Sequence, residues 1–71
     1  MKWYQILDAI HEIITLGSGC VVTDASGREV EFVRHRISLS GSGLSQEIVG
    51  ETPSGERRWV SIRQIKSVRE T

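Results

Sequence analysis

The chain has 71 residues, of which 38% are hydrophobic and seven are glycine, with nine basic and nine acidic side chains. This length supports one small hydrophobic core, so it excludes two domains and a large enzyme with a deep, enclosed pocket. A net charge of zero argues against a protein that binds nucleic acid through bulk positive charge.

The charge is distributed unevenly along the chain. Residues 1–33 contain two basic and five acidic side chains, a net charge of −3, and residues 34–71 contain seven basic and four acidic side chains, a net charge of +3. Such an asymmetry indicates a basic binding face or head-to-tail self-association. The alternative is that the charges are scattered in the folded protein.

The first predicted element is an amphipathic helix over residues 2–16. Its apolar side chains recur at the helical period and form a single stripe: Trp3, Ile6, Leu7, Ile10, Ile13 and Ile14. Gly17 is suited to the left-handed conformation that ends helices. A helix this short is not stable in water by itself, so we expect Ile6, Ile10 and Ile13 to be buried against the rest of the protein.

Short strands separated by glycine- and proline-containing turns follow the helix. The expected strands are residues 20–23, 28–40, 44–51, 57–62 and 66–69, with a tight helical turn before the last one. In the long second strand, the alternation of apolar residues changes parity near Val33 and Arg34, which predicts a bulge or sharp bend there.

The predicted fold is mainly β: a single domain, residues 1–71, with a closed five-stranded barrel over about residues 19–70 and the N-terminal helix. Its element order resembles the Sm-like fold, a variant of the SH3-like barrel. The segment Val60–Val68 resembles the second Sm motif, with Ile62-Arg63 matching and Gln64 in place of the family's glycine. The turn Ser40–Gly43 lacks the Asp and Asn of the first motif, so the resemblance does not imply the family's uridine recognition.

Two further stretches, Tyr4–Ala9 and Asp24–Val30, are similar to bacterial Sm-like proteins that bind the transcription termination factor Rho. This second resemblance implies a regulator that acts on a protein partner. The acidic N-terminal motif of those proteins is missing here, and this chain is neutral where they are acidic.

Catalytic and metal sites are not expected. Cys20, His11 and His35 lie in no known nucleophile motif, and their spacing matches no metal site, so we predict no enzyme activity, no cofactor, no metal and no small-molecule substrate. A single cysteine cannot form an intramolecular disulfide, which fits a cytoplasmic location, and no segment is long and apolar enough to span a membrane.

The segment 57–69 is the strongest candidate for a binding surface, because it has five basic side chains, no acidic one and Trp59. Trp59 has the opposite parity to Val60 and Ile62, which leaves it in the core, at a subunit interface or free to stack on a base. We expect a non-catalytic binding module that contacts RNA, or alternatively a protein-interaction adapter without nucleic-acid binding. The candidate contact residues are Arg34, Arg36, Arg57, Arg58, Trp59 and Arg63. Short strands with open edges also predict a homo-oligomer.

Overall fold

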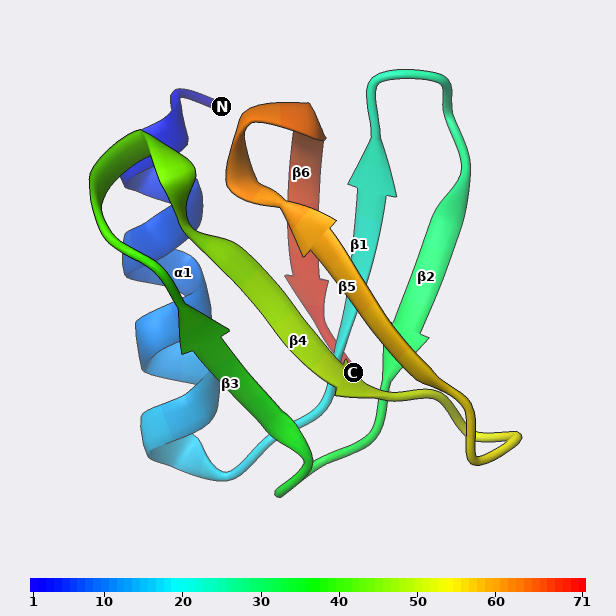
Figure 1. Cartoon of the computed structure of the whole chain (residues 1–71). Helices are drawn as coiled ribbons and strands as arrows, with labels where there is room; N and C mark the ends of the chain where they lie inside the picture. The colour runs from blue at the N-terminus through cyan, green and yellow to red at the C-terminus, as the bar shows by residue number, and fades with distance from the viewer.

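The computed structural model describes residues 1–71 and consists of one helix followed by six strands. The strands form two three-stranded antiparallel sheets, with the orders β2-β1-β6 and β3-β4-β5 (Figure 1). The elements are α1 (Trp3–Leu16), β1 (Cys20–Asp24), β2 (Glu29–Phe32), β3 (Ile37–Ser40), the 3₁₀ turn η1 (Gly43–Ser45), β4 (Glu47–Glu51), β5 (Arg57–Ser61), the 3₁₀ turn η2 (Ile62–Gln64) and β6 (Ile65–Glu70).

The predicted closed five-stranded barrel is wrong. The expected strand over residues 28–40 is two strands, β2 and β3, which belong to different sheets. Between them the chain turns at residues 33–36, where His35 has a φ of 65° and interrupts regular strand geometry. Each sheet ends in outer strands that pair on one side only, so the fold is a mixed α/β domain with two open sheets. The parity change did mark the position of this break.

Helix α1 ends and packs as its sequence predicts. Gly17 has a φ of 69°, and the backbone N–H groups of Gly17 and Ser18 donate to the carbonyls of Ile14 and Ile13 at 3.0 Å. The predicted burial of the helix isoleucines is confirmed, since all three are at most 5% exposed. The helix lies against β6 and η2 at one side of the two sheets (Figure 1), and its three isoleucines belong to the core cluster.

The core lies between the sheets and the helix. It contains nine buried side chains from all parts of the chain: Ile6, Ile10, Ile13, Cys20, Val22, Phe32, Ile48, Ile62 and Ile65. Phe32, the last residue of β2, is fully buried and lies against β4 at Gly50. A Cβ atom on Gly50 would lie 2.5 Å from Phe32 Cδ1 and 2.7 Å from the Arg36 carbonyl oxygen, so only glycine allows this approach.

Ile10→Ala tests the packing of the helix. Ile10 is 0% exposed, and its truncation removes core volume that the small domain cannot refill, so we expect a loss of about 2–5 kcal/mol in the free energy of unfolding. Urea denaturation followed by circular dichroism measures this loss. Glu12→Ala, an exposed position on the same helix, is the control and should change stability by about 0.5 kcal/mol or less. Equal stability of the two variants would show that α1 is not packed on the core.

Candidate binding surface

The sheet β3-β4-β5 has one face in the core and one face in solvent. Ile48 on β4 faces the core and pairs with Leu39 and Val60 on the neighbouring strands. The next residue, Val49, faces the opposite way and lies between Ser38 and Trp59. Because side chains alternate along a strand, this register places Trp59 on the outer face of the sheet.

Trp59 is the central feature of this outer face. Its side chain is 62% exposed, which excludes the core position that was one of its three predicted environments. Trp59 and Val49 lie directly opposite each other in the pairing of β4 with β5. Since an indole ring is large and mostly apolar, this exposure makes Trp59 a candidate contact residue.

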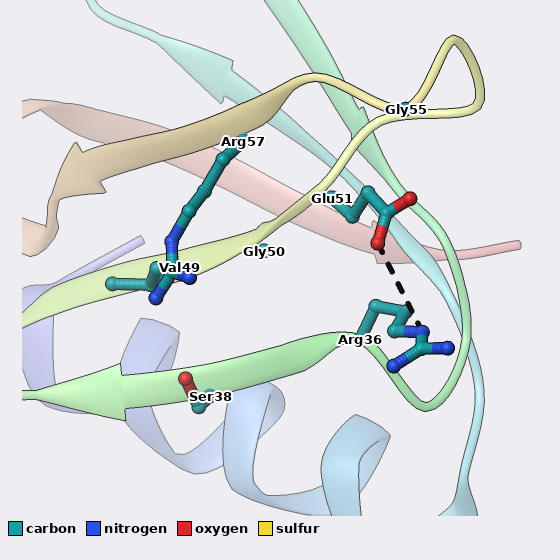
Figure 2. A pocket seen from close by; sticks show the side chains of 7 residues that line it. All are labelled: Arg36, Ser38, Val49, Gly50, Glu51, Gly55 and Arg57. Carbon is teal, nitrogen blue, oxygen red and sulfur yellow. Dashed lines mark ion pairs between the residues drawn. The ribbon is translucent and has the colours of Figure 1, made fainter.

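A shallow depression of about 240 Å³ lies on the same face (Figure 2). Figure 2 shows Arg57 extending from β5 across β4, so that its guanidinium group lies over Val49 and toward β3. At the other end of the depression Arg36 Nε lies 3.9 Å from Glu51 Oε2. The residues that line it are Arg36, Ser38, Val49, Gly50, Glu51, Gly55 and Arg57.

The charges on this face nearly cancel. Arg36 and Arg57 are matched by Glu51 and by Glu47, which share the outer face by the alternation of side chains along β4. The contact between Arg36 and Glu51 is long, and both side chains are substantially exposed, so the pair contributes little to stability and can rearrange when a partner binds. Arg57 takes part in no ion pair and is the free cation of the depression.

Three of the six predicted contact residues come together in the structure. Arg36, Arg57 and Trp59 share the outer face of the sheet, where Val49 links them. We name this set, Arg36, Val49, Arg57 and Trp59, the Trp59 face.

The other three predicted residues lie elsewhere. Arg58 alternates with Trp59 and so projects from the opposite side of β5, where its Nη2 donates to Glu56 Oε2 at 3.1 Å. Arg63 is exposed in η2, and Arg34 is exposed in the turn between β2 and β3. The predicted cluster of six is therefore divided among several surfaces, because neighbours on one strand face opposite ways and the other residues sit in turns.

Val49, Ser38 and Glu51 also belong to this surface, although the sequence did not mark them as candidate residues. The signal for Val49 was present in the turn Thr52–Gly55, which sets the register of the hairpin and so places Val49 opposite Trp59. Ser38 and Glu51 join the site through the pairing of β3 with β4 and the turn at residues 33–36, for which the sequence contains no comparable local signal.

The three residues considered as catalytic candidates have separate environments. Cys20 is fully buried in β1, and burial raises the pKa of its thiol to about 11. His11 is exposed on α1, and the ring of His35 lies close to Gly17 at the end of that helix. No group of three or more His, Cys, Asp or Glu side chains is arranged to hold a metal ion. No helix has the length and apolar character needed to cross a membrane.

No family model matches this chain, and no curated protein or solved structure is significantly similar to it. The resemblance to Sm-like and Rho-binding proteins therefore stays a prediction, and the site must be interpreted from its own geometry.

The raised pKa of Cys20 predicts both its reactivity and a pH dependence of stability. The folded state favours the neutral thiol, so the stabilisation is complete below the ordinary pKa of 9.0 and is lost as the pH rises toward about 11. At pH 8 we expect an aromatic disulfide reagent to react slowly with the native protein and rapidly in urea. Rapid reaction of the native protein would show that Cys20 is accessible.

Proposed function

We propose that this protein is a non-catalytic binding module and that its contact surface is the Trp59 face. The observation that carries the proposal is the exposure of Trp59 beside Val49 on a regular sheet. Tryptophan and arginine are the residues that contribute most to binding energy at protein interfaces, where an aromatic anchor is surrounded by contacts that exclude water. Trp59, Val49 and Arg57 have this composition.

The charge balance favours a protein as the partner. Nucleic-acid affinity comes mostly from phosphates neutralised by Lys and Arg, and here Glu47 and Glu51 share the face with the two arginines. A protein surface with its own mixture of charges fits such a face, because each ion pair can be formed again with a partner group. The proposed function is therefore an adapter or regulator that acts through protein contacts.

RNA is the second candidate ligand, and one observation favours it. Arg57 has no carboxylate partner, and it lies against the same Val49 that pairs with Trp59. An aromatic ring and a free guanidinium group on one sheet face can stack an unpaired base and neutralise a phosphate.

We also propose a cytoplasmic location, because the single cysteine is buried and not available for a disulfide.

Trp59→Ala is the direct test of the Trp59 face. We expect it to abolish copurification of the main protein partner from nuclease-treated extracts, because the anchor of the interface is lost, while the fold is retained. Leu16→Ala is the matched control, since Leu16 is also 62% exposed but lies at the end of α1, away from this face. The measurement is quantitative mass spectrometry of proteins recovered with each variant, with circular dichroism confirming that both are folded.

Two outcomes would contradict a protein partner. One is an identical set of recovered proteins for Trp59→Ala and Leu16→Ala. The other is tight binding of a labelled single-stranded RNA oligonucleotide that is lost in Trp59→Ala and weakens steeply between 50 and 200 mM salt, since that behaviour reports released counterions and would establish the RNA alternative.

A second copy of this chain is also a protein partner, in keeping with the predicted homo-oligomer. If copies associate through the Trp59 face, Trp59→Glu should shift the particle toward monomer and lower its melting temperature, because association and folding are linked by mass action. Light scattering over a dilution series, with the wild type alongside, measures the shift. A wild type that is monomeric at high concentration would refute self-association and leave a different protein as the partner.

A further inference from the structure

The free edge of β2 presents unpaired backbone groups. β2 pairs only with β1, and the N–H of Asp24 donates to the carbonyl of Arg28 at 2.9 Å where this pairing begins. Backbone groups alternate in direction along an antiparallel strand, so Arg28, Val30 and Phe32 bond toward β1. The N–H and C=O groups of Glu29 and Glu31 therefore point away from β1, toward the free edge.

Just after the last residue of β2, this edge is already paired with another strand. The N–H of Val33 donates to the carbonyl of Glu51 at 2.9 Å, so the end of β4 takes the place of a neighbouring strand at that one position. Beyond Glu51 the chain leaves β2 to form the hairpin to β5 (Figure 1). A groove of about 230 Å³ remains between β2 and the hairpin, lined by Glu29, Val30, Glu31, Thr52, Pro53, Ser54, Glu56 and Arg58.

The groove is acidic. Three carboxylates line it against the single cation Arg58, which is already bonded to Glu56 at 3.1 Å. Glu29 is paired with Arg69, also at 3.1 Å, whereas Glu31 takes part in no ion pair. Glu31 is thus the uncompensated charge beside the open backbone groups.

We propose that the groove accepts an extended segment of a protein partner, which adds as a strand to the free edge of β2 and places a lysine or arginine beside Glu31. The backbone groups of Glu29 and Glu31 supply sequence-independent hydrogen bonds, and the acidic lining selects a basic segment. A second copy of β2 is disfavoured, because it would bring its own Glu29 and Glu31 against the same carboxylates. Trp59 borders a neighbouring hollow with Glu29, Val30 and Arg58, but it does not line the groove itself, and the strand hydrogen bonds use only the backbone of β2.

The other open edges lack this combination. The free edge of β6 lies on the side where the helix packs, and no groove lies along the free edge of β3. The free edge of β5 borders a hollow of about 260 Å³, but there Asp24 and Glu29 are balanced by Arg28 and Arg58. Only at β2 do unpaired backbone groups, a groove and an uncompensated charge occur together.

The test uses the whole ¹⁵N-labelled protein and the capped peptide Lys-Val-Lys-Val-Lys-Val as the probe. NMR titration should show that the amides of Glu29 and Glu31 shift and exchange with water more slowly as the peptide is added. Glu31→Gln should weaken binding about two- to fivefold, the effect of one opposite-charge pair across strands. Glu31→Lys should reverse the preference, so that Glu-Val-Glu-Val-Glu-Val binds better than the lysine peptide. Leu16→Ala, at the exposed end of α1, is the control and should bind the peptide like the wild type.

Several results would overturn the proposal. One is the absence of any shift at millimolar peptide. Another is protection of amides on β3 or β6 instead of β2, and a third is equal binding of the lysine and glutamate peptides by the wild type. Strand addition can also be tested with two peptides that are N-methylated along one edge or along the other, because each cannot form the strand hydrogen bonds on its methylated side. If both peptides bind with unchanged affinity, strand addition is excluded. A single-stranded RNA oligonucleotide that shifts the Glu29 and Glu31 amides when the peptide does not would also exclude it.

Discussion

The close approach of Phe32 to Gly50 is the contact on which both proposed surfaces depend. The Phe32 ring lies close to where a Cβ of Gly50 would be, and this brings the end of β2 against the end of β4. Two backbone hydrogen bonds extend the contact, from Val33 N–H to the Glu51 carbonyl and from Glu51 N–H to the Arg36 carbonyl. Together they set one sheet against the other. The Trp59 face is consequently turned outward, and the groove opens where β4 leaves β2.

The core explains why the surfaces can remain exposed. Only nine side chains form the buried cluster, and the three helix isoleucines supply a third of them, so α1 completes a core that two short sheets cannot close by themselves. Trp59 is not needed for this packing, because Ile48, Leu39 and Val60 already fill the inner face of its sheet. This is why Trp59 is the residue on which the proposed contact surface is built.

Electrostatics separates the two surfaces from each other. The two oppositely charged halves of the chain meet in the pair of Arg69 with Glu29, which crosses one sheet. The sheet surface that carries the Trp59 face is close to neutral because Glu47 and Glu51 lie beside its two arginines, and the β2 groove is acidic because Glu31 is left without a partner. The two proposed surfaces therefore differ in chemistry, with an exposed aromatic ring at Trp59 and an acidic edge at β2.

The sequence by itself determined the local features of this protein. The spacing of Ile6, Ile10 and Ile13 defined the buried side of the helix, and Gly17 defined its end. The opposite parities of Trp59 and Val60 predicted that their side chains lie on opposite faces of the sheet. These features depend on interactions within a few residues, through helical period, strand alternation and turn chemistry. Only the tertiary structure decided that residues 28–40 form two strands, that the sheets stay open and that Val49 and Arg57 join Trp59. Those outcomes depend on which backbone groups far apart in the sequence pair with each other and on the space that Gly50 leaves for Phe32. No local sequence pattern predicts them.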